Sequence, residues 1–174
     1  MLATRAGEGD EEAFETLVRR HGPGLVQLAA RLLGSHAEAE DVVQDGFVGA
    51  WRKLPEFRGD STFRTWMYRI VTNRCLNVLR RRQAVVDLDS VPEPAAPEHT
   101  TSPVRTAEAR AAMDALAQAM GGLSPEQRVC WIMRELQAMP YETIADLVGI
   151  SPQAVRGRVF RARRHLTEAM VAWR

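Results

Sequence analysis

Apolar residues recur along this chain at every third or fourth position, which is the period of amphipathic helices and not of strands. The pattern predicts an all-α protein. A first helix should begin near residues 10–12 and break at residues 21–24, where Gly and Pro alternate. A second helix should then run from Leu25 to about Gly34. The early apolar positions are Phe14, Leu17, Val18, Leu25, Leu28, Ala29 and Leu32.

Residues 38–54 form the next predicted helix, and its two sides differ in character. Pro55 should end it, and residues 57–61 are typical of a loop. Ser61 or Thr62 is positioned to cap a further helix that extends to about Arg82. On one side lie the apolar residues Val43, Phe47, Ala50, Trp51 and Leu54. On the other side lie Asp41, Gln44, Asp45 and Val48.

The composition changes over residues 83–106, where four prolines stand among acids, alanines and threonines. We interpret this segment as a flexible, Pro-rich, acidic linker between two small helical domains, residues 1–82 and 107–174. The second domain has room for three or four short helices. One break is expected at residues 121–122, and Ser124 with Pro125 should start the helix that follows.

Net charge is only +1, but the charges are unevenly distributed. Residues 61–82 hold six Arg and no acid, whereas residues 83–108 hold five acids and one Arg. Basic segments attract phosphate and acidic faces attract basic protein, so the segments are predicted to have different partners.

Residues 141–164 have the pattern of a DNA-binding helix-turn-helix. Ala145 stands where two helices would cross, Gly149 at the tight turn and Val155 as the apolar anchor of the second helix. Ser151 and Pro152 should cap and start that helix. An ordinary helical hairpin with a solvated arginine face remains the alternative. The polar residues that the second helix should expose are Gln153, Arg156, Arg158, Arg161, Arg163 and Arg164.

Residues 61–82 also interleave aromatic rings with arginines. Cations hold a nucleic-acid backbone while flat rings stack on unpaired bases, so this mixture suits DNA that is opened as well as bound. The alternative is that Phe63, Trp66 and Ile70 are core residues at helical spacing, and we expect Trp66 and Ile70 to pack inward.

Several segments together resemble the extracytoplasmic-function sigma factors of the sigma-70 family. Residues 39–47 resemble the polymerase-binding helix of that family, and residues 57–73 its promoter-opening segment. Residues 123–128, residues 134–136 and the helix-turn-helix complete the resemblance, which covers about residues 12–82 and 107–166.

The resemblance implies a sigma factor that binds core RNA polymerase and promoter DNA without catalysis or a cofactor. The first domain would bind the clamp helices of the largest subunit and capture a flipped minus-ten base. The second would read the minus-thirty-five duplex near the flap of the second-largest subunit. An anti-sigma factor is a further implied partner. The implied polymerase-binding residues are Asp41, Gln44, Asp45 and Val48. The implied minus-ten residues are Arg58, Gly59, Asp60, Ser61, Thr62, Phe63, Trp66, Asn73, Arg74, Arg80 and Arg81. The implied minus-thirty-five residues are Ser151, Gln153, Ala154, Arg156, Arg158, Arg161 and Arg163.

Two departures from the family pattern stand out. Asp45 occupies a position where the family commonly has Glu. Residues 153–158 read Gln-Ala-Val-Arg-Gly-Arg where members usually carry Gly-Thr-Val-Lys-Ser-Arg. Gly157 costs roughly 1 kcal/mol of helix propensity relative to Ala, and it bears on promoter specificity.

Other classes of function are less well supported by the residues. The four histidines have no metal-site spacing and no glycine-rich phosphate loop is present, which argues against an enzyme. A regulator that binds DNA without polymerase would leave the arginine-aromatic segment without a role. An adaptor using residues 38–54 would leave the helix-turn-helix unexplained. No signal peptide or membrane span is apparent, so we expect a cytoplasmic protein with Cys75 and Cys130 as reduced structural thiols.

Overall fold

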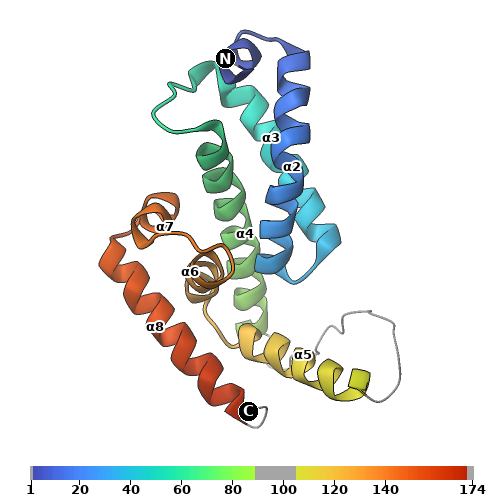
Figure 1. The fold of residues 1–174 in the computed structure, drawn as a ribbon, viewed down its shortest axis with the longest axis vertical. Helices are drawn as coiled ribbons and strands as arrows, with labels where there is room; N and C mark the ends of the chain where they lie inside the picture. Colours follow the sequence, from blue (N-terminus) through green and yellow to red (C-terminus); the bar gives the residue numbers. More distant parts are fainter. Residues whose placement is uncertain (1, 89–104, 172–174) are drawn as a thin grey trace. The chain divides into compact units, whose positions relative to one another are not determined.

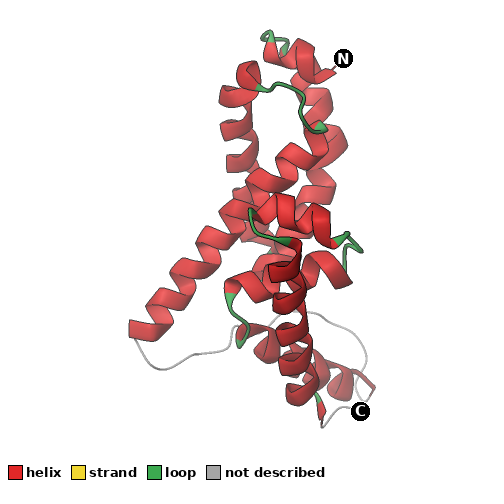
Figure 2. Cartoon of the chain, turned by 90° about the vertical axis from the view of Figure 1, so that its left-hand side faces the viewer, coloured by secondary structure: helices red, strands yellow, loops and turns green. Residues whose placement is uncertain are grey.

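The structure, a computed structural model, describes residues 2–88 and 105–171, with side chains described for residues 2–85 and 110–171. The described residues form helices and loops and contain no strand (Figure 2). This confirms the all-α prediction. The chain divides into two compact units (Figure 1). The first holds α1 to α3 and α4 up to Leu79, together with residues 146–149, and the second holds the rest of α4 with α5, α6, most of α7 and α8.

The first unit contains four α-helices and one 3₁₀ turn. Asp10 caps α2 by accepting a hydrogen bond from the Ala13 amide at 2.9 Å, and Gly34 closes that helix with a left-handed φ of 75°. Ser35 then caps α3. The elements are α1 (Leu2–Gly7), α2 (Glu11–Leu33), α3 (His36–Lys53), η1 (Leu54–Glu56) and α4 (Phe63–Leu88).

The predicted break at residues 21–24 is wrong, because α2 runs through it with Pro23 inside the helix. Proline removes one backbone hydrogen bond from a helix, but burial of an apolar face can outweigh that loss. Leu17, before the proline, and Leu25 and Leu28, after it, are all buried on the same core.

Helices α3 and α4 approach closely at Gly46. A Cβ atom there would lie 3.3 Å from a methyl group of Val71, so a larger residue would push the helices apart. The predicted apolar side of α3 is confirmed, since Val43, Phe47 and Ala50 are buried while Trp51 is half-buried.

The second unit consists of four helices among the described residues: α5 (Arg105–Gly121), α6 (Pro125–Glu135), α7 (Tyr141–Val148) and α8 (Pro152–Ala169). The expected break at residues 121–122 and the start at Ser124 are both confirmed. Ser124 and Gln127 form a reciprocal capping box at the beginning of α6. Arg128 donates to the Met120 carbonyl and so occupies an acceptor near the end of α5.

The predicted linker has only its edges in the described part of the chain. Helix α4 continues to Leu88, past the expected end at Arg82, because no proline interrupts it before that point. Helix α5 begins at Arg105. Residues 89–104, which include all four prolines of the predicted linker, lie outside the described residues. Among the described residues, no helix is long and apolar enough to cross a membrane.

Candidate protein and nucleic-acid interfaces

A groove of about 1000 Å³ lies between α2 and α3. Its floor is aromatic: the Phe14 ring centroid lies 4.7 Å from that of Trp51 and 6.2 Å from that of Phe47. Acidic side chains from both helices line the same groove, namely Glu11, Glu15, Glu40 and Asp41. The groove therefore suits a segment with an apolar ridge and basic flanks.

The predicted polymerase-binding residues are all exposed on α3. Asp41, Gln44 and Val48 line the groove, and Val48 is 48% exposed. Asp45 lies outside the groove lining and faces α4 instead. One of its carboxylate oxygens lies 3.7 Å from Nη1 of Arg74.

The loop between η1 and α4 has a defined conformation. Gly59 adopts a φ of 76°, which favours glycine. Thr62, not Ser61, caps α4, because its hydroxyl accepts a hydrogen bond from the Thr65 amide at 3.1 Å. Phe57 at the start of the loop lies against Trp66, with ring centroids 5.0 Å apart.

This loop forms one side of a second pocket, with a volume of about 1070 Å³. Five predicted minus-ten residues meet there: Arg58, Gly59, Ser61, Thr62 and Phe63. Arg20 and Arg64 add positive charge, and His21 lies beside Phe63 with ring centroids 5.5 Å apart. Burial, assisted by Arg20 and Arg64, lowers the pKa of His21, so the neutral ring is favoured in this pocket.

Part of the lining of this pocket was not predicted from the sequence. It is formed by α1, whose lining residues include Leu2, Ala3, Thr4 and Gly7, with Glu8 just beyond the helix. A six-residue helix is too short to give a periodic signal, so no feature of the sequence marked it.

The remaining predicted minus-ten residues do not line the pocket. Asp60, Asn73, Arg80 and Arg81 are exposed. The side chain of Arg74 lies over α3, where a Cβ atom on Gly49 would come within 2.9 Å of its Nη2 atom. Arg74 thus lies beside the predicted polymerase-binding face.

The burial of the aromatic side chains of α4 limits which of their rings could stack on an unpaired base. Phe63 is 7% exposed and Tyr68 6%, so the structure assigns both rings to the core of the first unit. Trp66 is half-buried, as is Ile70, so the expected inward packing is only partial for each. Among these rings, Trp66 retains the most accessible surface for a base.

The helix-turn-helix is confirmed in its fold. Ala145 is 3% exposed where α7 packs, Gly149 has a φ of 70° in the turn, and Val155 is fully buried in α8. The Ser151 hydroxyl accepts a hydrogen bond from the Ala154 amide at 3.2 Å and caps α8.

Helix α8 presents an open face, but the predicted DNA-reading residues do not all lie on it. Ser151, Gln153, Ala154, Arg156, Arg161 and Arg163 are exposed, whereas Arg158 is half-buried. Arg156 stacks over the Tyr141 ring at 5.3 Å from the centroid, and its Nη2 lies 3.6 Å from Glu142.

Two predicted arginines contact other protein groups, although only Arg158 is half-buried and Arg163 is exposed. Arg158 is half-buried, because position 158 falls near the buried side of α8. It lies close enough to Cys130 for its positive charge to oppose the rise in the pKa of that thiol. Arg163 pairs with Glu135 of α6 at 2.6 Å, and this bond raises the pKa of Arg163. The half-burial of Arg158 does not favour a direct base contact by that residue.

Phe160 is a residue that the sequence analysis missed. It is 65% exposed on α8 and follows Arg156 by four residues, so both lie on neighbouring parts of one helix face. Its position opposite the buried Val155 and Val159 is the signal that could have identified it.

Neither cysteine has the environment of a reactive thiol. Both are free and buried. Burial raises the pKa of Cys75 to about 12 and also raises that of Cys130. In the part of the chain that the structure describes, no group of three or more His, Cys, Asp or Glu side chains is arranged to hold a metal ion.

Two family models match the chain. Residues 17–85 match Sigma-70 region 2, and residues 113–166 match Sigma-70, region 4. The first match ends within α4, and the second runs from α5 into α8.

Similar proteins agree with these matches. The ECF RNA polymerase sigma-E factor of Escherichia coli (strain K12) is 33% identical over 171 residues, covering 94% of this chain and 89% of the relative. A structure of CnrH in complex with the cytosolic domain of CnrY has a TM-score of 0.68 at 32% identity, covering 98% of this chain and 96% of that one. A structure of the sigma factor RpoE with the anti-sigma factor NepR from Bartonella quintana also has a TM-score of 0.68, at 27% identity, with 92% and 98% covered.

Proposed function

Because the chain belongs to the extracytoplasmic-function sigma factors of the sigma-70 family, we propose how its two units share the work of promoter recognition. The first unit binds core polymerase and captures an unpaired minus-ten base. The second unit reads the minus-thirty-five duplex. The observation that carries this proposal is the presence on one chain of an acidic, aromatic-floored groove and an arginine-faced helix-turn-helix.

The groove between α2 and α3 is the proposed site for the clamp helices of the largest polymerase subunit. Phe14, Phe47 and Trp51 offer an apolar floor, while Asp41 and the other acids attract a basic partner. Val48 gains most from such a partner, since its exposed surface would be removed from water.

The loop formed by residues 57–62 is the proposed receptor for a flipped minus-ten base. The left-handed backbone at Gly59 lets the loop approach a base closely, and Ser61 and Thr62 offer hydroxyl groups to it. The arginines of the pocket can bind the phosphates of the same DNA strand. The aromatic cluster under the loop keeps this receptor in place.

Helix α8 is the proposed reader of the minus-thirty-five duplex. Gln153 and Arg156 stand near its start, where a recognition helix contacts base edges. Phe160 is suited to the methyl group of a thymine, and Arg161 to a phosphate. The half-buried Arg158 supports the helix on its protein-facing side, and the exposed Arg163 is held by Glu135 of α6.

Residues 83–106, whose edges lie in α4 and α5, are proposed to join domains 1–82 and 107–174 so that the two can bind separated promoter elements. The second domain would lie near the flap of the second-largest subunit. An anti-sigma factor is the proposed inhibitor, by analogy with the RpoE complex. A pull-down from native cells that recovers polymerase but never a small inhibitor would count against this partner.

Run-off transcription with core RNA polymerase tests the proposal. Genomic promoter fragments are transcribed with and without the purified protein, and transcripts from discrete start sites are expected only when it is present. The rival is a helix-turn-helix regulator that acts without polymerase. It would bind duplex DNA alone and leave core polymerase unable to initiate.

A further inference from the structure

Helix α1 lies outside the residues matched by Sigma-70 region 2, which begin at residue 17. It is nevertheless fixed to the first unit. Ala6 is 2% exposed, and a Cβ atom on Gly7 would lie 3.0 Å from the Leu54 carbonyl oxygen, so α1 sits directly against η1.

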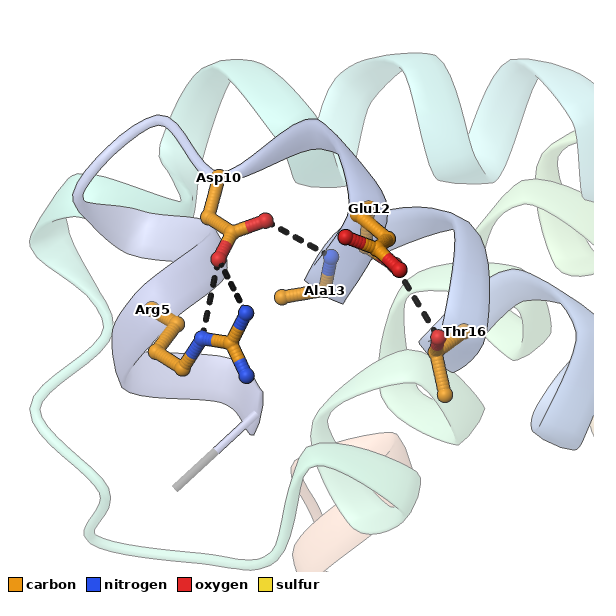
Figure 3. Close-up of polar contacts among 5 residues, drawn as sticks. All are labelled: Arg5, Asp10, Glu12, Ala13 and Thr16. Carbon is orange, nitrogen blue, oxygen red and sulfur yellow. Dashed lines mark hydrogen bonds and ion pairs between the residues drawn. The ribbon is translucent and has the colours of Figure 1, made fainter.

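A polar contact also holds the last turn of the same helix (Figure 3). The Arg5 guanidinium donates from Nε to Oδ2 of Asp10 at 2.8 Å, and its Nη2 lies 2.6 Å from the same oxygen. Asp10 also accepts from the Ala13 amide, and these two contacts lower the pKa of Asp10. One carboxylate therefore caps α2 and ties α1 to it.

The consequence of this anchoring is a pocket with two different sides. The loop side supplies Arg58, Ser61 and Thr62, while the α1 side supplies Thr4 and, just past its end, Glu8. Thr4 and Glu8 are both exposed. The lining of this pocket therefore includes a hydroxyl and a carboxylate from the α1 side, which can accept hydrogen bonds, and an arginine from the loop, which can donate hydrogen bonds to a phosphate.

We propose that α1 completes the receptor for the unpaired promoter nucleotide and that Glu8 favours a base with an exocyclic amino group over thymine. A carboxylate accepts hydrogen bonds and cannot donate them, and it pairs with the amino group of cytosine. Thymine offers no amino group and presents its carbonyl oxygens to the acid. Thr4 forms the neighbouring part of the wall. The inference rests on the proposed role of the 57–62 loop.

The test uses holoenzyme assembled from core polymerase and the full chain. The probes are fork-junction DNAs built on a promoter found in the run-off assay, with each of the four bases placed in turn at the flipped position. Thr4→Trp fills the pocket from the α1 side, and Glu8→Gln replaces the acceptor with a group that also donates. Glu12→Trp and Glu12→Gln are the matched controls, because Glu12 is exposed on α2 and lines neither pocket.

Thr4→Trp is expected to weaken binding of the preferred probe at least fivefold, with affinity for core polymerase unchanged. Glu8→Gln is expected to reduce the preference for an amino-bearing base over thymine by about fivefold. If both variants bind all four probes as the Glu12 controls do, α1 has no part in the receptor. If wild-type holoenzyme binds none of the fork probes, that result contradicts both the proposed role of the 57–62 loop and the proposed role of α1.

Discussion

Arg74 of α4 reaches across to Asp45 of α3, with Nη1 and Oδ2 3.7 Å apart. The arginine lies over Gly49, whose missing side chain leaves room for it. An exposed pair of this kind adds at most about 1 kcal/mol to stability. The pair matters mainly for its position, because it joins the predicted polymerase-binding face of α3 to α4, the helix that follows the minus-ten loop.

Reversal of the charge at Asp45 is therefore expected to affect binding far more than folding. Asp45→Arg should weaken affinity for core polymerase about tenfold or more, because a basic partner would then meet a like charge. Fluorescence anisotropy with labelled protein and core polymerase measures the loss. Glu56→Arg makes the same charge change on η1, which carries none of the predicted polymerase-binding residues of α3, and should leave affinity nearly unchanged. Equal losses for the two variants would show that total charge matters and the α3 face does not.

A comparison of two arginines on α8 tests which face of that helix reads DNA. Arg156→Ala should weaken binding to the minus-thirty-five element by on the order of 1–3 kcal/mol, since an exposed arginine near the helix start is lost. Arg158→Ala should weaken it much less, because that side chain is half-buried near Cys130. Electrophoretic mobility shifts with holoenzyme and promoter fragments measure both. If Arg158→Ala has the larger effect, the assignment of the open face of α8 is incorrect.

The helix-turn-helix was predictable because its signals are local. A glycine at the turn and a serine followed by proline at the helix start fix their own backbone conformations, and Gly149 and Ser151 do so here. The orientation of Arg158 was also readable in principle, from its phase relative to Val155 and Val159. Its proximity to Cys130 was not predictable from the local pattern, because Cys130 lies on another helix. That proximity argues against a direct base contact by Arg158.

Other features depended on tertiary packing. The continuity of α2 through Pro23 follows from the burial of Leu17, Leu25 and Leu28, which no local rule weighs against a proline. The wall formed by α1 depends on the Arg5–Asp10 contact and on the fit of Gly7 against Leu54. Neither is coded by spacing in the sequence.

Gly157 offers a direct test of a departure from the family pattern. A Cβ atom there would meet only the tip of Arg161, at 3.5 Å, so the position has space for a side chain. Gly157→Ala should raise the free energy of unfolding of the second unit by about 1 kcal/mol, because glycine is a poor helix former. Urea denaturation followed by circular dichroism measures the gain. Gly149→Ala is the opposing control, since its φ of 70° makes a side chain costly. A loss of stability in Gly157→Ala would mean that the helix is not regular at this point.

The buried cysteines should be unreactive while the protein is folded. Cys75 is fully buried and its raised pKa, about 12, leaves almost no thiolate at pH 8. Cys130 is also buried with a raised pKa. Alkylation with iodoacetamide, followed by mass spectrometry, is expected to label neither residue in native protein and both in urea. Rapid labelling of one of them in native protein would contradict this prediction and point to a reactive thiol at that position.

The same raised pKa gives the stability a pH dependence of known sign. The folded state holds the Cys75 proton up to about pH 12, whereas the ordinary value for an unfolded thiol is 9.0. Above pH 9 the unfolded chain therefore binds fewer protons than the folded one, and stability falls as pH rises. The slope from this group is about 1.4 kcal/mol for each pH unit. Denaturation at pH 8 and pH 10 measures it, and Cys75→Ala, which cannot ionise there, should show a smaller fall over the same interval. If wild type and Cys75→Ala lose stability equally, the thiol ionises as easily in the folded protein as in the unfolded chain.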